Sequence, residues 1–162
     1  MSAQIRTQVA SAVKACEEKK GEDISILEMD KNSSAFTDYF VICSGKNPRQ
    51  IQAIADEVEL RLKREGVPAN QVEGYNQADW VLLDYVDFVV HIFSEAARKF
   101  YDLERLWKSA HKLSVGDLRK PNARKAGKDS GSTRTAKAPA RKSARKPATR
   151  AGSTGRRHKS SK

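Results

Sequence analysis

The stretch DWVLLDYVDFVVHIF, residues 79–93, is the most strand-like part of this 162-residue chain and decides how its fold is interpreted. Aliphatic and aromatic residues of strand-forming type fill most of the stretch, which predicts two strands joined by a turn. Three aspartates and one histidine interrupt it, at Asp79, Asp84, Asp87 and His91. Polar residues in so apolar a run need a reason, because burying them without partners costs free energy.

A two-residue turn at Tyr85 and Val86 is expected, and it fixes which side chains share a face of the hairpin. One face is uniformly apolar and is expected to face the core; it carries Val81, Leu83, Phe88, Val90 and Ile92. The other face is mixed, with the expected cross-strand pairs Trp80 with His91, Leu82 with Val89, and Asp84 with Asp87. A mixed face with an aromatic anchor is typical of a partner-binding surface.

Two other interpretations of the mixed face remain open. Asp84, Asp87 and His91 could hold a divalent metal such as Mg²⁺ in a catalytic site. Such an enzyme also needs a phosphate-holding element, and the turn CSGKNP at residues 43–48 matches no phosphate-binding loop. Alternatively, the aspartates only end the strands at a turn, and His91 is a half-buried, satisfied histidine. We expect no catalytic residue, no metal and no cofactor.

The remaining elements follow from hydrophobic periodicity and from helix start and stop signals. The expected order is a helix over residues 5–20, strands over 23–29 and 39–45, a helix over 48–65, the hairpin, and a helix from Ser94 to Trp107. This α-β-β-α-β-β-α order predicts one α/β domain over residues 1–112, a mixed sheet of four or five strands with helices packed on it.

Three finer expectations accompany this fold. The wholly apolar strand 39–45 is expected to be buried on both faces. The helix that follows it predicts a right-handed crossover to a parallel strand at 80–84. In the last helix, Phe100, Leu103 and Trp107 are expected to share the core face.

Charge is distributed unevenly along the chain. Residues 1–112 contain 15 Lys and Arg against 18 Asp and Glu, whereas residues 113–162 contain 16 Lys and Arg against 2 Asp. Beyond Leu118 there is no aromatic residue and, proline apart, no aliphatic residue larger than alanine, so we expect residues 113–162 to form a disordered tail. Its composition is typical of an arm that binds nucleic-acid phosphates. The residues expected to make these contacts are Arg141, Lys142, Arg145, Lys146, Arg156 and Arg157.

The cellular compartment is predicted from features that the sequence lacks. There is no apolar run of about 18 residues, as a transmembrane helix requires, and the N-terminal region lacks the apolar core of a signal peptide. Cys16 and Cys43 have no metal-ligand spacing and are expected to be reduced core residues. We therefore expect a cytoplasmic protein that makes no membrane contact.

Six motifs follow one another in order along the chain: DYFVICSG (38–45), ADEV (55–58), VEG (72–74), ADWVLLDY (78–85), HIF (91–93) and FYDLERLW (100–107). Over roughly residues 5–110 they resemble the ribosomal silencing factor family, also called the Iojap family. The resemblance implies a fold similar to nucleotidyltransferases without an enzymatic role. It implies a translational repressor that binds the large ribosomal subunit through ribosomal protein L-fourteen and sterically blocks joining of the small subunit.

On the positions that match the family pattern, the residues expected to bind the partner are Trp80, Leu82, Asp84 and His91, with Arg98 and Tyr101 as secondary candidates. Tyr101 is equally compatible with the core. The family commonly has glycine where this chain has Val86, so the turn type here is expected to differ. The acidic balance of residues 1–112 suits a basic ribosomal protein. Beside the ribosome, the six named tail residues are expected to contact rRNA near the docking site.

Alternatives to the repressor hypothesis come from two other classes of protein. The chain could be a non-specific RNA- or DNA-binding protein that acts through its basic tail, with the domain as a platform for oligomerisation. It could also be a metal-dependent enzyme similar to nucleotidyltransferases. An exposed apolar hairpin surface is equally compatible with a homodimer.

Overall fold

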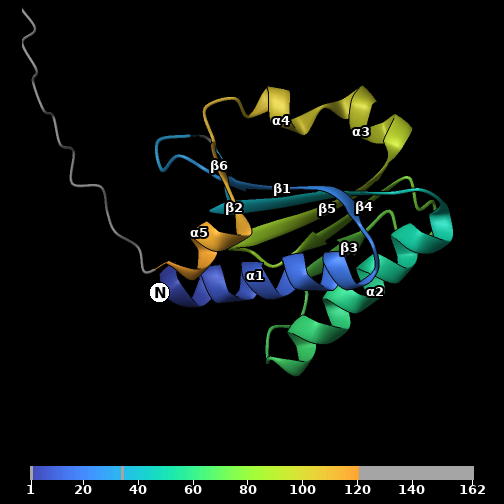
Figure 1. Cartoon of the computed structure of the whole chain (residues 1–162), viewed down its shortest axis with the longest axis horizontal. Coiled ribbons are helices and arrows are strands. Elements are labelled where there is room, and N and C mark those ends of the chain that lie inside the picture. The colour runs from blue at the N-terminus through green and yellow to red at the C-terminus, as the bar shows by residue number, and fades with distance from the viewer. Residues whose placement is uncertain (1, 34, 121–162) are drawn as a thin grey trace, which may run out of the picture. The chain divides into compact units, whose positions relative to one another are not determined.

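The computed structural model describes residues 2–33 and 35–120, which fold around one six-stranded sheet (Figure 1). The chain divides into two units, Met1–Lys125 and Ala126–Lys162, and the described residues all belong to the first. The helices are α1 (Ser2–Glu18), α2 (Pro48–Arg64), α3 (Glu95–Tyr101), α4 (Leu103–Leu106) and α5 (Val115–Arg119). The strands are β1 (Glu22–Glu28), β2 (Tyr39–Gly45), β3 (Gln71–Glu73), β4 (Trp80–Asp84), β5 (Phe88–Ser94) and β6 (His111–Leu113).

The strands lie in the order β3-β4-β5-β2-β1-β6. β2 and β5 pair in parallel, and the other four neighbouring pairs are antiparallel. The predicted mixed sheet with helices is confirmed, with short edge strands β3 and β6 added. The prediction that the strands at residues 39–45 and 80–84 are parallel to each other is wrong. The chain passes from α2 to the edge of the sheet, and the β4–β5 hairpin then brings β5, not β4, back beside β2.

The best-predicted elements are β2 and α2. Every residue of β2 is buried, as its apolar sequence predicts. At the start of α2, the Asn47 side chain accepts a hydrogen bond from the Gln50 amide at 2.8 Å, and Pro48 occupies a position where no amide donor is needed. The predicted apolar stripe of α2 is buried: Ile51, Ile54, Ala55, Val58 and Leu62.

The sheet carries helices on both faces, but the two layers cover it unequally (Figure 1). On the first face, α1, α2 and α5 pack over the larger core cluster, which includes Val13, Val58 and Leu118. On the second face, α3 and α4 pack over a smaller cluster around Ile42 and Phe93. α1 and α2 have 17 residues each, whereas α3 and α4 have 7 and 4. The second face is therefore only partly covered.

The predicted last helix is interrupted at Asp102, whose φ of 42° lies in the left-handed region. Aspartate tolerates this conformation better than most residues, so the interruption has a local cause. The predicted core face shared by Phe100, Leu103 and Trp107 is therefore wrong. The Phe100 side chain is 81% exposed, whereas Leu103 and Trp107 pack on the second face.

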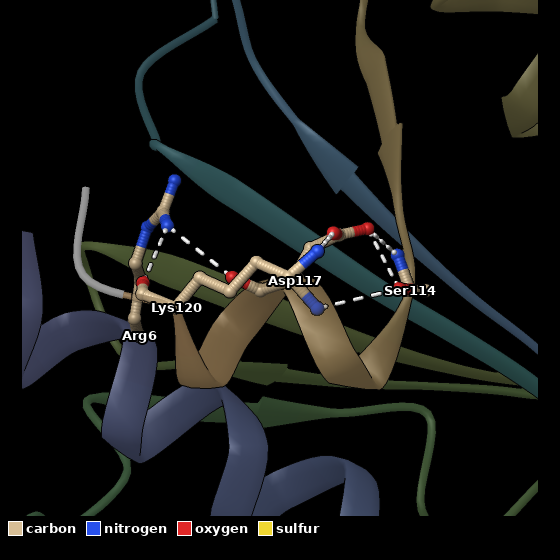
Figure 2. Close-up of polar contacts among 4 residues, drawn as sticks. All are labelled: Arg6, Ser114, Asp117 and Lys120. Atoms are coloured by element: carbon tan, nitrogen blue, oxygen red, sulfur yellow. Dashed lines mark hydrogen bonds and ion pairs between the residues drawn. The ribbon is translucent and has the colours of Figure 1, made fainter. Parts of the chain in front are cut away.

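The folded domain continues past the predicted boundary at residue 112. β6 pairs with β1, and the short helix α5 follows it. At its start the Ser114 hydroxyl donates to the Asp117 carboxylate at 2.6 Å, and the Asp117 amide donates back to that hydroxyl at 3.3 Å (Figure 2). The Ser114 hydroxyl and amide lower the pKa of Asp117 to about 2. Leu118 is buried in the first core cluster, so residues 113–119 belong to the domain.

Arg6 ties α1 to the end of α5 and to the sheet. Its Nη1 donates to the carbonyl oxygens of Asp117 and Lys120 at 3.4 and 3.5 Å (Figure 2). Its Nε donates to the Tyr39 hydroxyl at 3.2 Å, and its Nη2 pairs with Glu28 at 3.3 Å. The hydrogen bond to Tyr39 is the main reason that the pKa of Arg6 is raised. Because Arg6 is 8% exposed, this network lies largely out of water.

We predict that Arg6→Leu lowers the free energy of unfolding by about 3 kcal/mol, because it leaves the Glu28 carboxylate without its charge partner in a partly buried site. Urea denaturation measures this change. Arg64→Leu, at an exposed position of α2, should change stability by no more than about 0.5 kcal/mol. Equal effects of the two substitutions would show that the Arg6 network does not hold α5 in place.

Candidate partner-binding site

The β4–β5 hairpin differs from the prediction by two residues in register. Residues 85–87, not two residues, connect the strands. The observed pairs are Trp80 with Phe93, Leu82 with His91, and Asp84 with Val89. The predicted pairs are therefore wrong, but a shift of two residues keeps every side chain on its face. The predicted core face is confirmed, since all five of its apolar residues are fully buried and belong to the first core cluster: Val81, Leu83, Phe88, Val90 and Ile92.

The tip of the hairpin is held by Asp84. Its Oδ1 accepts a hydrogen bond from the Val86 amide at 2.8 Å, and its Oδ2 accepts one from the Asn70 side chain at 3.4 Å. Val86 has a φ of 70°, a conformation that is unfavourable for a β-branched residue. Its side chain is 60% exposed, so it projects from the turn with little packing to offset the strain.

An apolar groove of about 620 Å³ lies on the second face, between the hairpin and the loop that precedes β2. Its lining includes Phe36, Phe40, Leu82, Val86, Val89 and Trp107. Phe36 is fully exposed. The Asp38 amide donates to the Asp87 carbonyl at 2.8 Å, which holds this loop against the hairpin. The groove is the part of the second face that α3 and α4 leave open.

His91 lines the groove but is itself only 4% exposed. The Trp80 indole Nε1 donates to His91 Nδ1 at 3.1 Å, so the neutral ring carries its proton on Nε2. Burial lowers the pKa of His91 to about 4, and the ring is therefore neutral at pH 7. Trp80 is half-buried and packs against Phe93 and Tyr101, with ring centroids 5.1 and 4.6 Å away. Trp80 thus fixes the orientation of His91.

Two polar atoms beside the groove are buried and have no hydrogen-bond partner among the described residues: Thr37 Oγ1 and His91 Nε2. Leaving such a group unpaired costs about 1–3 kcal/mol. A partner that fills the groove with apolar atoms and brings an acceptor to His91 would recover part of this cost. The groove is therefore open and mostly apolar, with two unpaired polar atoms beside it.

Arg98 lies apart from the groove, beneath α3. It donates to the Ser44 hydroxyl at 2.9 Å and pairs with Glu104 at 2.7 Å. Glu104 also accepts from the Ser25 hydroxyl at 2.8 Å. Burial of Glu104 opposes ionisation, but the hydrogen bonds from Arg98 and Ser25 outweigh it, so the pKa of Glu104 is lowered. Arg98 thus anchors α3 and α4 to the sheet, and any effect it has on the groove is through their position.

The structure brings four predicted residues together on the second face: Trp80, Leu82, Asp84 and His91. Phe36 and Thr37 were missed, because the loop was predicted only as a connection. Phe36 was the available signal, as the one large apolar side chain in the polar segment NSSAFTD. The tail residues predicted to contact rRNA, Arg141 to Arg157, lie outside the described residues.

Within residues 2–33 and 35–120, no three His, Cys, Asp or Glu side chains are grouped so that they could hold a metal ion. Asp84 supports the turn and His91 is bonded to Trp80, while Asp87 is exposed. Cys16 and Cys43 are free and buried in the core, as predicted. No helix in the same part of the chain is long and apolar enough to cross a membrane.

These features define a small α/β domain: a helix-covered sheet with an open apolar groove on one face. The sequence model of the family described as ribosomal silencing factor during starvation matches residues 2–144. The chain belongs to this family, which confirms the predicted resemblance.

Relatives with names of the same family support this assignment. The ribosomal silencing factor RsfS of Bacillus subtilis is 42% identical over 99 residues, which are 61% of this chain and 83% of that protein. The protein of the same name from Halalkalibacterium halodurans is 43% identical over 99 residues, 61% of this chain and 84% of its own length. A mouse protein, mitochondrial assembly of ribosomal large subunit protein 1, is 30% identical over 93 residues, 56% of this chain and 40% of its own length.

Solved structures are similar to the whole described fold. A crystal structure of a Chromobacterium violaceum protein has a TM-score of 0.62 at 36% identity and covers 68% of this chain and 90% of its own. A crystal structure of a Bacillus halodurans protein has a TM-score of 0.58 at 39% identity and covers 65% and 95%. The α/β fold class is therefore shared with known structures.

We predict that His91 makes stability depend on pH. Its pKa is about 4 in the fold and about 6.5 in the unfolded chain, so the unfolded state binds the proton more readily. The stabilisation is complete above pH 6.5 and is lost as the pH falls towards 4. Between pH 7 and 5, the free energy of unfolding should fall by about 2 kcal/mol more in the wild type than in His91→Gln, as measured by urea denaturation. Parallel pH profiles of the two proteins would contradict a neutral, buried His91.

Proposed function

We propose that this chain is a translational repressor that binds the large ribosomal subunit through ribosomal protein L-fourteen and blocks joining of the small subunit. Its family is described as silencing ribosomes, and relatives about 40% identical carry that name. The name of the mouse relative refers to assembly of the large subunit, which supports that subunit as the partner. Blocking the joining of the small subunit requires binding to the large subunit but no catalytic turnover, so no catalytic residue is needed.

The observation that carries the proposal is the incomplete groove on the second face. An apolar side chain of the partner would fill the space over Leu82 and Val89. A carbonyl or hydroxyl of the partner would accept a hydrogen bond from His91 Nε2, which is buried and has no partner among the described residues. Trp80 would support this contact by holding the His91 ring in place.

Charge around the groove suits a basic ribosomal protein. Asp38, Asp84 and Asp87 lie in the loop and the hairpin that flank the groove, and none of them forms an ion pair with another described residue. Carboxylates at the rim of an interface raise the rate of association with a basic partner and disfavour contact with RNA phosphates. The tail, with Arg141, Lys142 and their neighbours, would add contacts to rRNA beside this docking site.

We predict that Leu82→Glu weakens binding to the large subunit by at least about thirtyfold, because a charge would be placed where the partner must bury apolar atoms. Co-sedimentation of the full chain with purified large and small subunits at moderate salt measures this loss. Leu60→Glu is the matched control, since Leu60 is an exposed leucine on α2, in the helix layer of the first face. Near-ultraviolet circular dichroism checks that both variants are folded.

Binding to the large subunit that is lost in Leu82→Glu and kept in Leu60→Glu would support the groove as the docking site. Equal binding to both subunits, unaffected by either substitution, would contradict the proposal. That result would favour the alternative in which the basic tail binds nucleic acid and the domain does not select the subunit.

A further inference from the structure

α3 and α4 carry a second apolar patch, on the side of these helices that is exposed to solvent. The side chains of Phe100 and Leu106 are 81% and 70% exposed, and Tyr101 next to them is partly exposed. These residues border a shallow hollow of about 480 Å³ that shares no lining residue with the groove. Large apolar side chains exposed side by side commonly mark an interaction site.

The apolar patch is surrounded by positive charge. Lys99, Arg105 and Lys108 line the same hollow, and Asp102 is the one carboxylate among its lining residues. None of the three cations forms an ion pair with another described residue. The neighbouring Glu104 is engaged with Arg98 and does not neutralise them. The net charge of residues 1–112 is negative, so the positive charge of this patch is opposite in sign to that of this part of the chain as a whole.

We propose that this patch binds single-stranded RNA, with Phe100 stacking on an unpaired base and the three cations contacting the flanking phosphates. Unpaired RNA is commonly held by an exposed aromatic ring for the base and by lysine or arginine for the backbone. Cations and apolar side chains are interspersed between Lys99 and Lys108, so one strand lying on the patch would meet both kinds of side chain. The proposal rests on the proposed function, because rRNA next to the docking site is the source of the strand.

The position of the patch fits this source. Tyr101 of the patch packs against Trp80, with ring centroids 4.6 Å apart. Trp107 lines the groove, while its neighbours Leu106 and Lys108 line the patch. A protein held in the groove and an RNA strand held on the patch would therefore contact consecutive residues at the end of α4. Such neighbouring protein and RNA contacts are what the surface of a ribosomal subunit provides.

Photochemical cross-linking tests the base contact directly. The full chain is irradiated with a single-stranded RNA about a dozen nucleotides long that contains one 4-thiouridine. Trypsin cleaves after Lys99 and Arg105, so Phe100 and Tyr101 are recovered in the single peptide FYDLER. We expect a nucleotide adduct on this peptide in the wild type and its loss in Phe100→Ala. Adducts confined to residues 121–162, or an undiminished adduct on the corresponding peptide (residues 100–105) of Phe100→Ala, would overturn the proposal.

The salt dependence of binding tests the phosphate contacts. Replacing Lys99, Arg105 and Lys108 together by serine should reduce the slope of log affinity against log salt by about 2, because three contacts to a single strand are lost. Fluorescence anisotropy of the labelled oligonucleotide measures the slope. The matched control replaces three exposed cations of α1 and α2, which are Lys14, Lys63 and Arg64. An equal change of slope in the two triple variants would mean that only net charge matters, and the proposal would fail.

Co-sedimentation with the large subunit separates this proposal from the proposed function. If the patch variants bind RNA as the wild type does, and the wild type still sediments with the large subunit in a Leu82-dependent way, this inference fails and the proposed function stands. If the patch variants lose subunit binding without any change in RNA binding, the patch contacts a protein, and the RNA proposal is wrong. Failure of the wild type to bind the large subunit would instead remove the proposed function.

Discussion

Burial of β2 on both faces is the constraint on which the rest of the structure depends. A strand whose seven residues are all buried needs apolar cover above and below the sheet. α1 and α2 supply a full layer on the first face, and the Arg6 network fixes α5 beside them. On the second face only the short helices α3 and α4 are available, and the Arg98–Glu104 pair holds them over one end of the sheet.

The shortness of that second layer produces the candidate site. Beyond the end of α4, the apolar residues of β4 and β5 have no helix above them, and the loop of residues 35–38 closes only one side. This arrangement costs free energy: beside the groove, two buried polar atoms have no partner among the described residues, and a valine at the hairpin tip has a left-handed conformation. A surface that leaves such costs unrelieved in the free chain favours a partner that relieves them.

The sequence predicted what depends on long local patterns. The apolar run of β2, the cap and stripe of α2 and the two faces of the hairpin were all predicted correctly, because each follows from periodicity over many residues. The predicted hairpin register was wrong because the turn is one residue longer than expected. The longer turn, Tyr85 to Asp87, requires Val86 to adopt a conformation that valine disfavours. The break at Asp102 and the strand β6 were missed because one left-handed residue and three paired residues leave no periodic signal. The groove depends on a contact between segments far apart in sequence, and no local pattern predicts it.

Hydrogen exchange of the full chain, with and without purified large ribosomal subunits, tests most directly whether the open end of the second face is the docking surface. Docking at this surface predicts slower amide exchange in two segments on binding, the loop of residues 30–38 and the hairpin tip of residues 84–88, with α1 and α2 unchanged. Unchanged exchange in both segments, with protection confined to α1 and α2 or to the basic tail, would contradict it.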